Sequence, residues 1–359
     1  MTVGDISTLL VWGAMTAFTV GFLAYTADLA RIAEAASRAS RLPTAERELA
    51  EVGAGVSSAV SSAVSSSAAG TRPAAAGGGT GAVPAAGGSR RAEGIARATT
   101  YLGVILLLAG IVARGIAAGR WPTANMYEFT LVGALVAVTV LAVVLRRRYI
   151  PFLGVVVHGI AVLALALALL VFYVQADAVQ PALQSYWLVL HVGVAISATG
   201  VFTVAFAAAV LQVLKDAREA GRSRLDTPWQ RFEPVRGGLR RWRVTGPAWE
   251  WLRSVPSARE LEALSFRLNS IGFVLWTFTL IGGAIWAEHA WGRYWGWDPK
   301  EVGTFIAWVV YAAYLHARTT RGWSGRRAAY FVFVGYAVVL ANFTVINLFV
   351  TGKHSYSGL

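Results

Sequence analysis

The chain has 359 residues, of which 56% are hydrophobic and 14% are charged, and its mean hydropathy is +0.55. Because an average soluble domain carries about 25% charged residues, this composition excludes a soluble globular protein and indicates a membrane protein that crosses the bilayer several times. The formal net charge of +13 fits basic loops beside anionic lipid, and the chain has no basic and aromatic nucleic-acid-binding motif, so nucleic acid is not an expected partner.

Apolar stretches long enough to cross the hydrocarbon core as helices, about 20 residues each, recur along the whole chain. They predict helices at residues 6–27, 98–117, 128–145, 151–175, 188–214, 268–287, 301–317 and 329–350. The predicted fold is therefore an all-α membrane protein with about eight transmembrane helices. The first stretch lacks a basic region before it and a small-residue cleavage site after it, so it is predicted to be a retained span rather than a cleaved signal peptide.

Lysine and arginine are concentrated in alternate predicted loops, which sets the orientation. Residues 31–97, 146–148, 215–267 and 318–327 hold 27 of the 32 basic residues. Those on the opposite side are Arg120, Arg293, Lys300 and Lys353, while Arg114 lies near the outer end of the second predicted helix, where a long side chain reaches the interface. Because cytoplasmic loops carry the excess of positive charge, both termini are predicted to lie on the outer face.

Two stretches interrupt the predicted helices. Residues 31–96 are mostly Ala, Ser, Gly and Pro in their central part, a composition that buries too little apolar surface to fold, and they predict a disordered cytoplasmic linker. This linker separates an N-terminal helix within residues 1–30 from a seven-helix bundle at 97–359. The basic loop 215–267 contains four tryptophans. It is either an interfacial element on the inner leaflet or a basic loop without chemistry.

Histidine is the candidate ligand type, because the absence of cysteine leaves any disulfide, thiolate or redox chemistry to a partner. The predicted helices place His191, His289 and His354 near the outer face, and His158 and His316 toward the inner face. His316 lies ~25 Å along its helix from the outer end. A single histidine is most often a hydrogen-bonded imidazole, but three near one face favour ligation of a metal or haem iron.

The aromatic segment, residues 291–297, reads WGRYWGW between two apolar stretches. The next four residues, Asp298, Pro299, Lys300 and Glu301, match the first positions of a helix that begins with a capping box. An aromatic belt at the membrane surface explains tryptophans but does not require glycines between the rings. The segment is therefore predicted to leave flat access for a planar cofactor, which aromatic contacts stabilise by ~0.5–1.5 kcal/mol per pair, with two outer histidines as its ligands.

The sequence resembles a known family in several motifs. WAEHAWGRYWGWDPKE at 286–301, here called the WWD segment, is similar to the tryptophan-rich signature of haem-handling proteins, specifically the CcsA/ResC-type subunit of system II cytochrome c maturation, labelled CcsB in actinobacteria. Further matches fall in the family's order: NMYEF at 125–129, PALQSYWLVLHV at 181–192, RLNSIGFVLWTFTLIGGAIWA at 267–287, YLHAR at 314–318 and KHSY at 353–356. An ordered set over roughly residues 97–359 is far more specific than one motif.

The resemblance implies that the WWD segment binds haem b on the outer face, with His191 and His354 as axial ligands. It implies that His316 is a transient haem site toward the inner side. The other implied binding residues are Trp291, Tyr294, Trp295, Trp297 and Asp298. His289 stands where the family has another residue, so it is either a surface histidine or an alternative ligand. His158 matches no family histidine, which leaves core packing and ligation open.

The implied function is export of haem across the bacterial plasma membrane and its presentation to the Cys-x-x-Cys-His segment of apocytochrome c. A ResB-type membrane protein and a thioredoxin-like thiol reductant are the implied partners, and haem lyase activity is expected only in complex with the partner. Lys300, Arg293 and Lys353 either neutralise haem propionates or are ordinary juxtamembrane cations.

Two alternatives do not involve haem. A transporter or proton-relay subunit would carry carboxylates inside its spans, whereas Glu128 and Glu301 lie at predicted helix ends. A structural scaffold would use the aromatic segment as a docking surface.

Overall fold

The computed structural model describes residues 1–39, 90–176, 185–223, 225–227, 233–239 and 242–354. Its elements in chain order are α1 (Val3–Ala39), α3 (Arg90–Ala118), α4 (Met126–Arg147), α5 (Pro151–Leu170), α6 (Tyr186–Glu219), α7 (Glu233–Leu239), the 3₁₀ helix η3 (Pro247–Ser254), α8 (Ala258–Trp291), α9 (Pro299–Thr320), α10 (Arg326–Phe343) and α11 (Val345–Phe349). No strand occurs among these described residues, so the predicted all-α class is confirmed.

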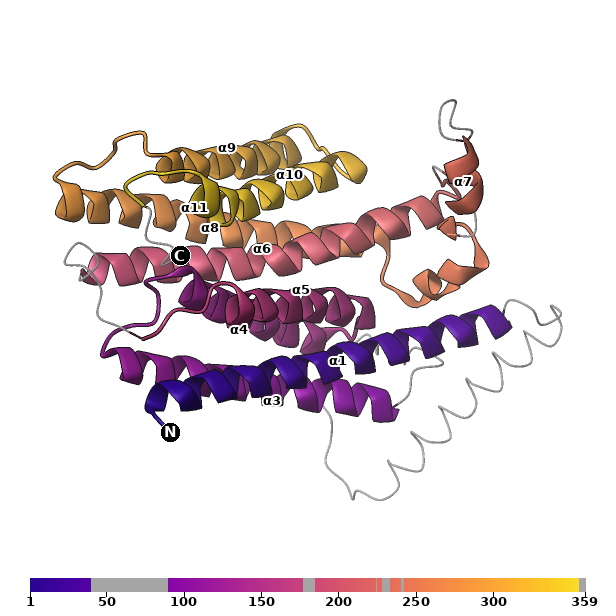
Figure 1. Ribbon diagram of the computed structural model, residues 1–359. Helices are drawn as coiled ribbons and strands as arrows, with labels where there is room; N and C mark the ends of the chain where they lie inside the picture. Colours follow the sequence, from indigo (N-terminus) through magenta and orange to yellow (C-terminus); the bar gives the residue numbers. More distant parts are fainter. Residues whose placement is uncertain (40–89, 177–184, 224, 228–232, 240–241, 355–359) are drawn as a thin grey trace, which may run out of the picture.

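Seven of the described helices are long and apolar enough to cross a membrane. They are α1, α3, α4, α5, α6, α8 and the continuous segment formed by α10 and α11. Helix α9, predicted at 301–317, is present with 22 residues, but tyrosine, threonine, histidine and arginine make it less apolar than the others. It nevertheless lies alongside α10 and in line with the other long helices (Figure 1).

Successive long helices run in opposite directions, so their connections gather at two ends of the bundle (Figure 1). The aromatic end carries the N-terminus and the connections 119–125 and 292–298. The basic end carries the connections 148–150 and 321–325, together with α7 and η3. The membrane face on which each end lies stays a prediction from the distribution of positive charge.

Helix α1 packs directly against α3 and α5. Gly103 of α3 faces the ring of Phe18, and Gly154 of α5 faces the ring of Tyr25, so any larger residue at either glycine would collide with an aromatic ring of α1. Small residues allow this close approach between membrane helices, and α1 therefore shares one core with the rest of the bundle. Of the predicted linker 31–96, residues 31–39 belong to α1 and 90–96 to α3, while 40–89 lie outside the described residues.

Helix α6 is central and contacts α4, α5, α8 and α10. Both α6 and α8 have 34 residues, about 51 Å at the α-helical rise, and so exceed the ~30 Å hydrocarbon core. Helix α8 begins ten residues before the predicted 268, because Ser257 and Glu260 form a capping box. The two helices therefore occupy parts of the predicted loop 215–267.

The remaining part of that loop packs partly against the bundle. Trp251 of η3 is only 6% exposed, and its ring stacks on Phe152 at 5.4 Å between centroids. Trp242 is exposed, and Trp229 lies outside the described residues. Burial of Trp251 against Phe152 means that this ring is held by protein contacts rather than left free for the lipid surface.

Candidate functional site

A cavity lies at the aromatic end, lined by α4, α6, α8, α9, α10 and α11 and by the chain on either side of them. Its empty space of about 1190 Å³ includes open solvent at its mouth. Its apolar wall includes Met126, Phe129, Leu188, Val192, Ala195, Leu280, Ala284, Trp286, Val339 and Phe343. The cavity therefore suits a mostly apolar ligand.

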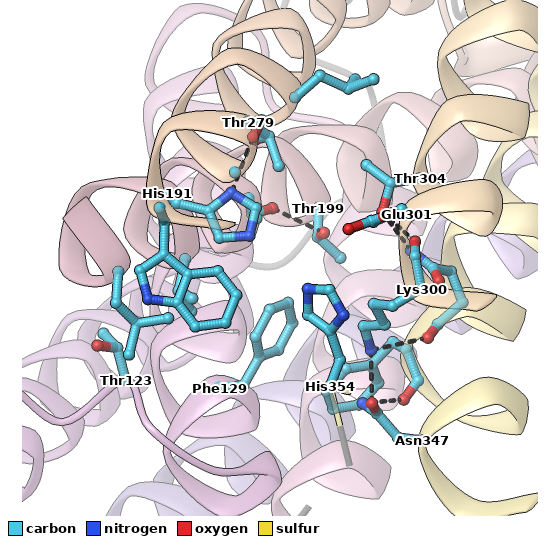
Figure 2. A pocket seen from close by; sticks show the side chains of 18 of the residues that line it. Thr123, Phe129, His191, Thr199, Thr279, Lys300, Glu301, Thr304, Asn347 and His354 are labelled. Carbon is cyan, nitrogen blue, oxygen red and sulfur yellow. Dashed lines mark hydrogen bonds between the residues drawn. The ribbon is translucent and has the colours of Figure 1, made fainter. Parts of the chain in front are cut away.

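His191 projects from the first turns of α6 into this cavity (Figure 2). Its Nδ1 atom lies 2.8 Å from the carbonyl oxygen of Thr279 on α8, which makes Nδ1–H the donor. The ring lies nearly parallel to that of Trp286, at 6.2 Å and 6°. Gly283 gives the ring its room, because a Cβ there would lie 2.7 Å from Cε1 of His191.

His354 reaches the same cavity from the C-terminal side, beyond α11. Its Nδ1 atom lies 2.7 Å from Oδ2 of Asp298, and Oδ1 of Asp298 accepts a hydrogen bond from the Lys353 backbone N–H at 2.7 Å. Asp298 is also the N-cap of α9, and Glu301 completes the predicted capping box. The DPKE helix start thus holds the C-terminal segment in place.

The charges of this pair leave His354 able to bind a metal. Burial lowers the pKa of His354, although its hydrogen bond with Asp298 opposes that shift. Burial acts to raise the pKa of Asp298, but hydrogen bonds from the Lys353 backbone N–H and His354 hold it below its ordinary value. Near neutral pH the carboxylate is therefore ionised and the imidazole is neutral, which is the pairing that orients many metal-binding histidines.

The two imidazoles share one chemical arrangement. In each, Nδ1 is engaged, and Nε2 has no hydrogen-bond partner among the described residues. Trp286, 1% exposed, neighbours both of them, with its ring 6.2 Å from that of His191 and 5.5 Å from that of His354. Two imidazoles on one aromatic cavity, each with Nε2 unengaged by the described residues, are candidate ligands for a haem iron. The described residues contain no cluster of three or more His, Cys, Asp or Glu that would form a closed metal site.

The predicted aromatic residues divide into three groups. Tyr294 and Trp295 line the cavity. Trp291 lies outside the lining and packs edge-on against His354 at 4.9 Å. Trp297 is 72% exposed, has a φ of 59°, and stands at 88° to the ring of Trp295. The aromatic segment is therefore not a flat surface; the space for a ligand is the cavity beneath it.

The two glycines of the aromatic segment have local structural roles that differ from the predicted flat access. Gly292 ends α8 in the left-handed conformation, at φ 70°. Gly296 lies against the guanidinium of Arg293, so a side chain at Gly296 would displace that group. A helix end and the seating of an arginine thus explain both positions without a ligand.

His158 is fully buried and far from the cavity lining. Its Nε2 lies 3.0 Å from Oγ1 of Thr100, and its Nδ1 lies 3.0 Å from the carbonyl oxygen of Gly154. Both ring nitrogens therefore have protein partners. This geometry matches core packing, one of the two interpretations that the sequence left open.

The other two histidines also lie away from the cavity lining. His289 has a side chain that is 51% exposed, beside Glu288. His316 is exposed on α9, nearer its basic end. Of the five histidines, the cavity brings together His191 and His354 only.

The NMYEF motif at 125–129, to which the sequence assigned no role, forms part of the cavity wall. Glu128, 0% exposed, accepts hydrogen bonds from Arg114 at 3.1 Å and from Arg120 at 2.7 Å. Arg114 is 2% exposed, so its guanidinium is held within the protein by Glu128, and its position near the membrane interface stays a prediction. The position of Arg114 along its helix does not reveal that a buried carboxylate lies beside it. The ion pair between Glu128 and Arg120 anchors the connection 119–125 beside the cavity.

The fold and this site define a multi-pass helical membrane protein with paired candidate haem-iron ligands. The chain belongs to the cytochrome C assembly protein family, whose sequence profile matches residues 122–354. It is 32% identical over 264 residues to a cytochrome c biogenesis protein CcsA of Prochlorococcus marinus, covering 70% of this chain and 80% of that protein. The CcsA of Thermosynechococcus vestitus is 37% identical over 262 residues, covering 68% and 82%. The expected CcsA-type cytochrome c biogenesis protein is confirmed.

The fold also resembles a solved structure. The cytochrome c haem lyase CcmF superposes with a TM-score of 0.58 at 16% identity, over 96% of this chain and 47% of that one. At this identity the likeness concerns the fold, and this chain corresponds to about half of the larger protein. Together with the family match, it associates the bundle with proteins of cytochrome c assembly, in which haem takes part.

Proposed function

We propose that this protein binds haem b between His191 and His354 and presents it for covalent attachment to apocytochrome c. The observation that carries the proposal is the pair of imidazoles on one cavity, each with Nδ1 engaged and Nε2 without a partner among the described residues. Two neutral imidazoles satisfy both axial positions and favour low-spin iron. The apolar wall shields the ring from water.

Residues of this chain hold the two ligands in position. The Thr279 carbonyl orients His191, and the Asp298 carboxylate orients His354, which sets the tautomer and strengthens the ligand. Because the chain has no cysteine, both thiols come from the Cys-x-x-Cys-His segment of the apocytochrome. Each thioether forms by addition of a cysteine S–H across a haem vinyl group, so no leaving group is required.

Release and reduction involve other proteins. The histidine of the apocytochrome segment replaces one axial imidazole of this chain, and a thioredoxin-like partner keeps the two cysteines reduced. Haem lyase activity arises in complex with a ResB-type membrane protein. The excess of Lys and Arg in the connections of the basic end favours a cytoplasmic position for that end, and we infer that the cavity faces the outer side of the bacterial plasma membrane.

His316 serves a separate stage of the same route. Its exposed position on α9 suits a transient haem-receiving site toward the inner side, ~25 Å along the helix from its start at Pro299. A haem-free proton-relay subunit is disfavoured because the fully buried Glu128 is paired with two arginines, which leaves it no free proton-carrying role.

The test is the optical spectrum of the purified protein. We expect a six-coordinate low-spin b-type spectrum, which His191→Gly or His354→Gly weakens and added imidazole restores, because a small ligand fills the open axial position. His289→Gly is the matched control, since its side chain is exposed outside the cavity. Colourless protein from haem-replete cells contradicts haem binding. If His289→Gly weakens the low-spin spectrum and His191→Gly does not, the assignment of His191 as a ligand is wrong.

A further inference from the structure

Polar side chains cluster on one side of the cavity. They come from the start of α9 and from the end of α10 with α11, namely Lys300, Glu301, Thr304, Asn342 and Asn347. Figure 2 shows Lys300 and Asn347 grouped beside His354, with Thr123 on the far side of the cavity. Apart from the two histidines, the charged groups of the lining belong to this polar side, whereas the polar groups elsewhere in the lining are uncharged. A ligand that fills the cavity therefore meets charged groups along one edge.

Lys300 belongs to this polar side and forms no ion pair with the described residues, because no carboxylate oxygen among them lies within 4 Å of its Nζ atom. Nζ donates to the carbonyl oxygen of Asn342 at 3.0 Å and to Oδ1 of Asn347 at 2.6 Å. An ammonium group has three N–H donors, so one donor stays available to a ligand.

Arg293 and Lys353, the other two cations that the sequence suggested for haem propionates, lie outside the cavity lining. The guanidinium of Arg293 lies 4.0 Å from Glu301, and Nζ of Lys353 lies 5.8 Å from the ring centroid of Trp291. Among the described residues that line the cavity, Lys300 is the one basic side chain besides the two histidines.

We propose that Lys300 binds a carboxylate of the ligand in this cavity, which for haem is a propionate. The proposal rests on the proposed function and adds the group that recognises one edge of the ring. A buried cation that lacks an anionic partner is unfavourable, and a ligand carboxylate removes that cost through a charge-assisted hydrogen bond. The contact directs the propionate edge of the ring toward α9 and the opposite edge toward Thr123.

Lys300 also has a purely structural interpretation, because its hydrogen bond to the Asn342 carbonyl satisfies the end of α10. A structural role predicts that removing the ammonium lowers the stability of the protein and lowers its affinity for every ligand equally. A carboxylate-binding role predicts that the loss depends on whether the ligand carries carboxylates. Haem and its dimethyl ester differ in that respect alone, so they separate the two roles.

The experiment titrates haem-depleted, purified full-length protein with haem and with haem dimethyl ester, following the low-spin absorption band. We expect wild-type protein to bind haem about tenfold more tightly than the ester, as one charge-assisted hydrogen bond implies. In Lys300→Met the preference disappears because haem binding weakens and ester binding does not. Lys300→Arg retains the preference, and so does the control Arg321→Met, which removes an exposed cation at the far end of α9.

Two results overturn the assignment of Lys300: equal binding of haem and ester by wild-type protein, or an unchanged preference in Lys300→Met. The first of these needs no variant and so holds even if Lys300→Met does not fold. Failure of the proposed function looks different, because wild-type protein would then give a low-spin spectrum with neither ligand.

Discussion

Asp298 begins helix α9 and at the same time holds His354, with 2.7 Å between its Oδ2 and the imidazole Nδ1. One carboxylate thus joins a helix start to a segment that follows the last helix in the chain. The position of His354 in the cavity depends on this contact, because residues 350–354 have no regular secondary structure of their own. One side chain therefore both caps the helix and holds His354 in position.

Asp298→Asn separates these two functions. Asparagine remains a good N-cap but lacks the charge that makes His354 a stronger ligand. We expect haem affinity to fall about 10- to 100-fold, as for other residues that orient a ligand histidine, with little change in thermal stability. Spectral titration and thermal unfolding in detergent measure the two effects.

The matched control for Asp298→Asn is Ser257→Asn at the N-cap of α8, which also has a capping box but lies at the basic end. This control is expected to leave haem binding unchanged. Wild-type haem affinity in Asp298→Asn would show that the carboxylate does not orient the ligand.

Gly283→Ala tests the seating of His191. The added Cβ would lie 2.7 Å from Cε1 and 2.9 Å from Nδ1 of His191, so the imidazole must move away from the Thr279 carbonyl. We expect a weaker low-spin band in this variant, although alanine favours the helix by ~1 kcal/mol. In the control Gly282→Ala, the new Cβ meets His191 at an ordinary 3.6 Å, and a normal spectrum is expected. Equal spectra in both variants would contradict the arrangement of His191.

His316→Ala tests the proposed inner site. Because His316 does not line the cavity and lies ~25 Å along α9 from the helix start at Pro299, it cannot be an axial ligand there, and its loss is expected to interrupt supply only. The variant should contain less haem when purified from cells, yet bind externally added haem with two-histidine ligation. Haem content is compared at matched protein levels and matched melting behaviour, and normal occupancy would remove His316 from the haem route.

Glu128→Gln tests the buried ion pairs behind the cavity wall. It leaves Arg114, 2% exposed, without its carboxylate, and breaking such a buried pair costs about 3–5 kcal/mol. The control Glu260→Gln breaks the exposed pair with Arg148, which is worth about 0–1 kcal/mol, while glutamine keeps the capping box. Unfolding in detergent should show a much larger loss for Glu128→Gln; similar losses would contradict a structural role for the cluster.

The features that the sequence determined by itself are local or compositional. Apolar stretches of membrane length predicted the long helices, because each helix satisfies its own backbone hydrogen bonds within lipid. The letters DPKE predicted the start of α9, since capping involves residues three apart. The ordered motifs identified the family, and the proposal of His191 and His354 as a ligand pair came from that resemblance.

Only the tertiary structure decided what surrounds those ligands. Trp286 neighbours both imidazoles, Arg114 pairs with Glu128, and Lys300 lines the cavity. The flat aromatic surface expected from WGRYWGW is replaced by a cavity beneath crossed rings. The physical reason is that a helix specifies the spacing of its own residues, whereas contacts between helices depend on how their surfaces pack. A charged side chain that becomes buried in this packing, such as Arg114, must then pair with a polar group on a neighbouring element.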